Sequence, residues 1–230
     1  MEIKPEFKPK AIRSFVIRAG RMTDGQRGAF DAHWPHYGLS LFGGQLDSRT
    51  VFGNDHPLVV EVGFGMGDSL LAMAKAEPEL NFVGVEVHPP GVGRLINNAA
   101  KEGVNNLRVY MADAKDVLTD CIADGSLARF QLYFPDPWHK KKHHKRRIVQ
   151  ADFIALIARK LQPGGLLHMA TDWQEYAEHM LEVVHAEPLL VNTVENFAPR
   201  PEFRPITKFE TRGERLGHGV WDLLLRRVQE

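Results

Sequence analysis

The chain has one cysteine, no long apolar run and no net charge, and each of these absences excludes a class of protein. A single cysteine, Cys121, among 230 residues excludes an internal disulfide framework, and we expect it to pack rather than react. No apolar run approaches the roughly 18 residues that span a bilayer, and residues 1–15 lack the apolar core of a signal peptide. We therefore expect a cytoplasmic protein without a membrane segment.

The charge is balanced overall but unevenly placed. Lysines and arginines number 29 and acids 29, yet the segment from His139 to Arg147, here called the basic strip, holds six Lys or Arg, three His and no acid. Charge runs are most often solvated loops. A concentration this local is also typical of a surface for phosphates, the sequence-independent part of nucleic-acid binding. Its histidines sit among cations, which opposes a divalent ion, so we expect no metal site.

The order of strand and helix patterns from Leu58 onward predicts one α/β domain. The expected strands are 58–62, 81–87, 107–112, 130–134, 166–171, 189–197 and 219–228, and the expected helices are 68–78, 89–103, 114–125, 148–161 and 173–186. This order predicts a doubly wound, mostly parallel seven-stranded sheet with the last strands antiparallel. Residues 1–56 carry few regular signals, so we interpret them as a partly flexible N-terminal extension of a domain at 57–230.

Acids and glycines gather at the ends of the first three expected strands. The acids are Glu61, Glu86 and Asp113, and the glycines that follow the first strand are Gly63, Gly65 and Gly67. The carboxyl ends of parallel strands share the edge where α/β sheets bind ligands, and glycines let a ligand approach the backbone. Three carboxylates suit a nucleoside carrying positive charge better than a pyrophosphate, with Glu86 placed for a ribose. The alternative is that such acids only cap helices, as Asp113 could, and Asp68 is separately expected to be the N-cap of the helix at 68–78.

The fourth expected strand ends in Pro-Asp-Pro-Trp, residues 135–138, directly before the basic strip. The two prolines fix φ beside Asp136, so its carboxylate is aimed by a stiff turn. Asp172 ends the fifth strand and belongs at the same edge, although it could instead be the N-cap of the next helix. We expect Trp173 to pack, whereas both packing and stacking on a base stay open for Trp138.

Five motifs in this order, EVGFGMG, VGVEVH, PDPWHKKKHHKRR, ATDW and TKFETRG, resemble the bacterial tRNA (guanine-N7)-methyltransferases. The resemblance runs from about Arg13 to the last residues. It implies a class I methyltransferase fold, which is Rossmann-like, with S-adenosylmethionine as methyl donor. It also implies that the acceptor is a guanosine in the variable loop of tRNA. No obligate protein partner is evident from the sequence.

The resemblance also implies roles for particular residues. Contacts to the donor or reacting centre fall to Glu61, Glu86, Asp113 and Asp136, contacts to the substrate to Lys140, Asp172, Thr207, Lys208, Phe209 and Glu210, and contacts to RNA to Lys142, His143, His144, Lys145, Arg146 and Arg147. Lys142 and His144 stand where the family pattern has Arg and Asn. The lysine keeps the charge but lacks the bidentate geometry that arginine offers a phosphate.

The chemistry of the acceptor agrees with this set of residues. Guanine N7 has a lone pair and no proton, so methyl transfer needs no general base. Catalysis then depends on alignment and on carboxylates placed where positive charge develops. Of Asp136, Asp172 and Glu210, we expect Asp136 to carry the catalytic effect. A small-molecule or protein acceptor would leave the basic strip without a use, and the intact turn at 61–67 argues against an RNA-binding module without catalysis.

Overall fold

The computed structural model describes all of the chain except residues 1–2, 10–13, 16–21, 207–209, 211–218 and 230. The chain divides into two compact units. Unit 1 consists of Met1–Pro9 and Ile17–Ala123, and unit 2 of Lys10–Val16 and Asp124–Glu230. Each unit has its own buried apolar core.

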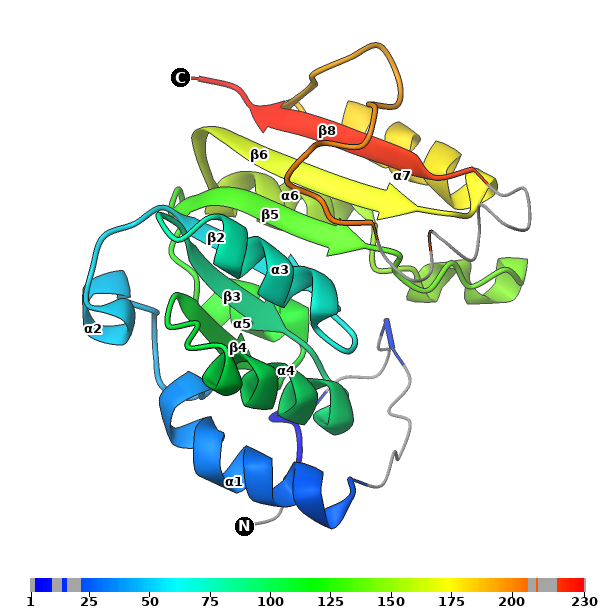
Figure 1. Cartoon of the computed structure of the whole chain (residues 1–230). Helices are drawn as coiled ribbons and strands as arrows, with labels where there is room; N and C mark the ends of the chain where they lie inside the picture. The colour runs from blue at the N-terminus through cyan, green and yellow to red at the C-terminus, as the bar shows by residue number, and fades with distance from the viewer. Residues whose placement is uncertain (1–2, 10–13, 16–21, 207–209, 211–218, 230) are drawn as a thin grey trace. The chain divides into compact units, whose positions relative to one another are not determined.

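Unit 1 is built on parallel strands in the order β1-β4-β3-β2. The strands are β1 (Gly38–Leu39), β2 (Leu58–Val62), β3 (Asn81–Val85) and β4 (Leu107–Tyr110), and the helices are α1 (Asp24–Tyr37), α2 (Ser48–Phe52), α3 (Asp68–Ala76), α4 (Pro89–Lys101) and α5 (Ala114–Asp120). Every residue of β2, β3 and β4 is buried, as expected of parallel strands covered by helices. Helix α1 lies beside α4 (Figure 1).

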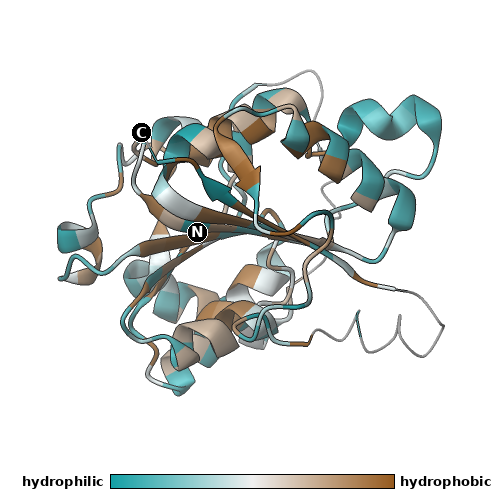
Figure 2. Cartoon of the chain, turned by 90° about the horizontal axis from the view of Figure 1, so that it is seen from above, coloured by the Kyte–Doolittle hydropathy of each residue, from teal (hydrophilic) through white to brown (hydrophobic). Residues whose placement is uncertain are grey.

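Unit 2 has strands in the order β5-β6-β8-β7. Its elements are β5 (Leu127–Tyr133), the 3-10 helix η1 (Lys141–Arg146), α6 (Ala151–Lys160), β6 (Leu161–Thr171), α7 (Gln174–His185), β7 (Leu190–Asn192) and β8 (Trp221–Arg227). Strand β5 is parallel to β6, whereas β8 is antiparallel to β6 and to β7. Figure 2 shows the strands mostly brown and the helices with teal faces, the pattern of a buried sheet under amphipathic helices.

The predicted fold class is confirmed, with eight strands in the described residues instead of seven. The additional strand is β1, in which Gly38 pairs with Val109 and Leu39 with Tyr110. A strand of two residues is too short to show the alternation of apolar and polar residues from which strands are predicted.

Residues 1–56 also contain helices α1 and α2, which the sequence pattern did not predict. Phe30, Trp34 and Tyr37 recur at helical spacing in α1 and were obscured by the surrounding Gly, His and Pro. Helix α2 has an Asp47 N-cap and a left-handed Gly53 after its end. The domain boundary near residue 56 stays a prediction.

Two details of the expected helices were wrong. The N-cap of α3 is Gly67 and not Asp68, whose carboxylate instead pairs with the Arg94 guanidinium at 2.9 Å. Helix α5 ends at Asp120, so Cys121 follows the helix instead of lying on it. The Cys121 side chain is nevertheless fully buried, as its expected packing role requires, and burial raises the pKa of the thiol.

Candidate functional site

Left-handed glycines shape the turn between β2 and α3. Gly63, Gly65 and Gly67 have φ angles of 74°, 59° and 79°, which residues other than glycine rarely adopt. A Cβ at Gly67 would lie 2.7 Å from Leu95, so close packing against α4 also requires this glycine. A Cβ at Gly63 or Gly65 would meet nothing within 4 Å. The space beside these two residues is therefore open to a ligand.

Glu86 joins this turn to the end of β3. Its carboxylate accepts hydrogen bonds from the backbone N–H groups of Gly65 at 2.9 Å, Val87 at 2.6 Å and His88 at 3.1 Å. Burial raises the pKa of Glu86, and the three N–H groups oppose this shift by favouring the charged form. A carboxylate offers about four acceptor positions, so one remains for a donor such as a ribose hydroxyl.

The other two predicted acids of unit 1 lie at the same edge of its sheet. Glu61 is the fourth residue of β2 and is buried, and Asp113 follows β4 and is also buried. Asp113 is the N-cap of α5, because its side chain accepts a hydrogen bond from the backbone N–H of Lys115 at 2.9 Å. The capping role is thus confirmed for Asp113.

In unit 2, the turn after β5 is held in an unusual conformation. Phe134 and Trp138, which flank the Pro-Asp-Pro sequence, have φ angles of 49° and 46°. Such angles are costly for aromatic residues and persist only where the surroundings enforce them. The Trp138 indole N–H donates to the Ser14 carbonyl at 3.2 Å, and the Arg146 guanidinium lies 5.1 Å from the centre of the ring. Asp136 projects from this fixed turn as an exposed side chain.

The contacts of the two tryptophans bear on their predicted roles. Trp138 is engaged by Ser14 and Arg146, which favours packing over base stacking for this ring. Trp173 is half-buried and meets the ring of His139 edge-on, with centroids 4.3 Å apart.

Asp172 is half-buried. The alternative that Asp172 is the N-cap of the next helix is wrong, because the N-cap of α7 is Trp173 and no side chain caps this helix.

The basic strip forms η1 and presents most of its cations to solvent. Lys140, Lys141, Lys142 and Lys145 are exposed, whereas His143, His144 and Arg146 are half-buried. Partial burial and the neighbouring cations lower the pKa of His143. A neutral His143 at pH 7 would hydrogen-bond to RNA and not pair with a phosphate as a charge.

Arg147 is the exception in the strip, since only 3% of it is exposed. Its guanidinium donates to the Pro137 carbonyl at 2.8 Å and to the Glu175 carboxylate at 3.0 Å, and it lies over the Tyr176 ring. The hydrogen bond from Arg147 lowers the pKa of Glu175. The RNA contact expected of Arg147 is not supported by this position. We assign it instead the role of fastening the strip to α7 and to the turn that carries Asp136.

The substrate residues expected near the end of the chain are only partly described. Thr207, Lys208 and Phe209 lie outside the described residues. Glu210 is buried, and both of its carboxylate oxygens accept from the Arg204 guanidinium at 2.7 Å. Direct contact of Glu210 with guanine is therefore not supported, because its carboxylate is engaged inside unit 2. No pattern in the sequence indicated this pairing.

The buried His168 should make stability depend on pH. Burial lowers the pKa of His168 from 6.5, and its hydrogen bond to Asp222 only partly opposes the shift. Below pH 6.5 the unfolded chain gains a proton that the folded chain does not, so stability should fall as pH falls from about 7. The slope from one such group is at most about 1.4 kcal/mol per pH unit. Urea unfolding between pH 5.5 and 7.5 should show a shallower slope in His168→Gln, and equal slopes would contradict the assignment.

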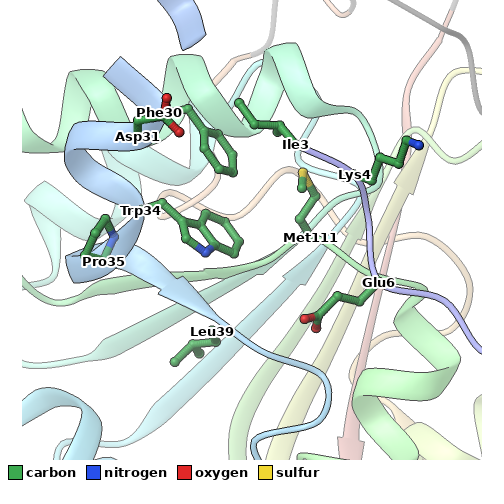
Figure 3. Close-up of a pocket in the computed structure, with 9 residues that line it drawn as sticks. All are labelled: Ile3, Lys4, Glu6, Phe30, Asp31, Trp34, Pro35, Leu39 and Met111. Carbon is green, nitrogen blue, oxygen red and sulfur yellow. The ribbon is translucent and has the colours of Figure 1, made fainter. Parts of the chain in front are cut away.

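Unit 1 also contains a cavity of about 260 Å³ that none of the predicted site residues lines. Its walls come from the N-terminal segment, α1, β1 and Met111, which directly follows β4 (Figure 3). Phe30, Trp34 and Met111 point into it, while Lys4 and Glu6 lie on the N-terminal segment.

No helix among the described residues is long and apolar enough to cross a membrane.

Comparisons with known proteins agree with this geometry. A family model described as "Putative methyltransferase" matches residues 55–223. Among solved structures, the 16S rRNA methyltransferase KamB matches with a TM-score of 0.58 and 16% identity, over 80% of this chain and 95% of that one. The aminoglycoside resistance methyltransferase NpmB1 matches with a TM-score of 0.53 and 20% identity, over the same shares. The fold is therefore that of the class I methyltransferases.

Curated relatives narrow the class to one family. A protein of Saccharophagus degradans is 64% identical over 227 residues, which cover 98% of this chain and 99% of the relative. A protein of Alcanivorax borkumensis is 58% identical over 95% of this chain and 92% of the relative. Both are named tRNA (guanine-N(7)-)-methyltransferase. The chain belongs to the tRNA (guanine-N7)-methyltransferase family.

Proposed function

We propose that this protein transfers a methyl group from S-adenosylmethionine to N7 of a guanosine in tRNA, at position 46 of the variable loop. The observation that carries the proposal is the match to a tRNA (guanine-N(7)-)-methyltransferase at 64% identity over almost the full length of both chains. The exposed lysines of the basic strip support a polyanionic acceptor.

Several features of unit 1 support a site for the methyl donor there. The open space beside Gly63 and Gly65 admits a ligand close to the backbone, and the Glu86 carboxylate is placed to accept from ribose hydroxyls. Glu61 and Asp113 add negative charge at the same edge, which favours a cationic ligand. When bound, S-adenosylmethionine supplies an electrophilic methyl group on a positively charged sulfur.

Unit 2 supplies the groups for the acceptor. N7 of guanine has no proton to lose, so its reaction needs placement and charge stabilisation and no base. We assign Asp136 the catalytic role because its exposed carboxylate stands on a fixed turn. Lys140 and Asp172 are proposed substrate contacts, and Lys142, His143, His144, Lys145 and Arg146 are proposed RNA contacts. We further propose that the enzyme works in the cytoplasm without a metal or an obligate protein partner.

Transfer of isotopically labelled methyl groups to unmodified bulk tRNA tests the proposal. We expect nucleoside mass spectrometry to find the label in N7-methylguanosine. Label recovered in another nucleoside, or in protein but not in tRNA, would refute the assignment. Binding of S-adenosylmethionine without any transfer would favour a binding module over an enzyme.

Removing exposed lysines from η1 should weaken tRNA binding in a salt-dependent way. In the variant with Lys141, Lys142 and Lys145 changed to Ala, the slope of log K against log salt should fall by roughly 0.9 for each phosphate that the protein no longer neutralises. The affinity for S-adenosylmethionine should not change. Filter binding of tRNA at several salt concentrations measures the slope.

The matched control removes three exposed cations of unit 1, Arg49, Lys75 and Lys101, and so changes the net charge equally. Its slope should stay close to that of the unaltered protein. Equal slopes in both triple variants would mean that the strip is a solvated loop with no role in binding RNA.

A further inference from the structure

A continuous path of hydrogen-bonded, buried side chains crosses unit 2 from Tyr133 to Glu210. The Tyr133 hydroxyl lies 2.9 Å from His168 Nδ1, and His168 Nε2 lies 2.7 Å from Asp222 Oδ1. Arg204 bonds to both carboxylate oxygens of Asp222, at 2.8 and 2.9 Å, and to both of Glu210 at 2.7 Å. The path joins β5, β6 and β8 to Arg204 and Glu210.

The polar and charged groups on this path have the partners that buried groups require. A neutral His168 that donates from Nε2 to Asp222 and accepts at Nδ1 from Tyr133 satisfies both ring nitrogens. The positive charge of Arg204 is shared between the two carboxylates, and the buried Arg129 is near enough to act on His168 electrostatically. Two bidentate pairs on one guanidinium demand its planar fork, which lysine does not have.

One end of the path leads to the turn with Asp136, the proposed catalytic residue, and the other leads to Glu210, in the motif to which the family resemblance assigns substrate contacts. Tyr133 is the last residue of β5, and the turn with Asp136 begins directly after it. Glu210 is the last residue of the TKFE motif. The Arg204 guanidinium also lies 5.9 Å from the centres of the Tyr133 and Phe134 rings. A shift of Arg204 would thus disturb Glu210 and the turn with Asp136 at once.

We propose that Arg204 is a positioning residue, which holds Glu210 and steadies the turn with Asp136 through Asp222, His168 and Tyr133. Glu210 then serves to hold the Arg204 guanidinium and not as a ligand of guanine. This inference rests on the proposed function. Arg204 is fully buried and cannot touch tRNA itself, so its effect must pass through the groups that it holds.

A double-mutant cycle with Arg204→Lys and Glu210→Gln tests the proposal. The measured quantities are the single-turnover rate constant of methyl transfer at saturating donor and tRNA, and its amplitude. Each single variant should lose roughly 10- to 100-fold in rate constant, because misplacement of about 1 Å has effects of this size. The double variant should be no more than about threefold slower than the slower single variant, since both changes break one link.

The rate constant separates positioning from stability. A purely structural role would lower the amplitude, which reflects the amount of folded enzyme, and leave the rate constant unchanged. Unchanged rate constants in both single variants would overturn the proposal. So would a double variant whose loss equals the product of the two single losses, since Glu210 would then act independently of Arg204.

Two further variants keep the test decisive. Arg226→Lys changes an exposed arginine of β8 that donates to the Gly164 carbonyl, and it should react within twofold of the unaltered enzyme. Tyr133→Phe removes one hydroxyl at the other end of the path and serves if Arg204→Lys does not fold. It should slow transfer severalfold, and a normal rate constant would overturn the link to the Asp136 turn. Failure of the unaltered enzyme to methylate tRNA would instead refute the proposed function.

Discussion

Asp136→Asn should lower the single-turnover rate of methyl transfer about 10²- to 10³-fold, while tRNA affinity falls much less. The substitution keeps the shape of the side chain and removes its charge. Loss of one group aimed at developing charge typically costs about 2.7–4 kcal/mol of barrier. The turn holds Asp136 between prolines and two left-handed aromatic residues, so the carboxylate is in place before charge moves.

A matched control is Asp152→Asn, which makes the same chemical change at an exposed residue in the first turn of α6. This variant should transfer methyl groups at the normal rate. No proton leaves N7, so lowering the pH toward 5 should not rescue Asp136→Asn. A near-normal rate in Asp136→Asn, or a loss confined to tRNA binding, would move the catalytic role to Asp172.

Gly65→Val should abolish binding of S-adenosylmethionine at concentrations that saturate the unaltered protein. The space at the Gly65 Cβ is empty in the protein, so the new side chain would occupy the region proposed for the ligand. A β-branched residue at a φ of 59° also strains the backbone, by roughly 1–3 kcal/mol. Calorimetric titration measures binding, and urea unfolding measures the strain.

Gly53→Val separates these two effects. Gly53 also has a left-handed φ, of 77°, and open space at its Cβ, but it ends α2 and belongs to no proposed site. Both variants should lose stability to a similar extent, and only Gly65→Val should lose the donor. Normal binding in Gly65→Val, or equal loss of binding in both, would contradict the location of the donor site.

The sequence was sufficient for most of the fold because strands and helices from Leu58 onward are long or strongly patterned. The buried strand β2 was predicted with its bounds, and the antiparallel placement of β8 followed from the missing helix between the last two strands. Strand β1 escaped because two residues have no pattern, and it forms only through pairing with β4. Strand β7 spans Leu190–Asn192, much less than the run of 189–197 suggested.

The candidate site shows where sequence reasoning stops. The family resemblance implied an RNA contact for Arg147 and a substrate contact for Glu210, but both side chains are buried in ion pairs. Glu175 is distant in sequence from Arg147, and Arg204, which pairs with Glu210, also pairs with Asp222 on β8. Because these partners are distant in sequence, no local sequence pattern predicts the pairs. For Glu86, by contrast, the local sequence is enough to predict the position of the side chain. This acid ends a strand beside a glycine turn, and a backbone N–H of that turn binds its carboxylate.

The most direct test of the proposed activity is to map the methylated nucleotide. An unmodified tRNA with guanosine at position 46 and a variant with adenosine there would be incubated with protein and S-adenosylmethionine. Reduction with borohydride and cleavage with aniline then breaks the chain at N7-methylguanosine. The proposed function predicts cleavage at position 46 in the first RNA and none in the second. Cleavage at another guanosine, or equal methyl incorporation into both RNAs, would contradict it.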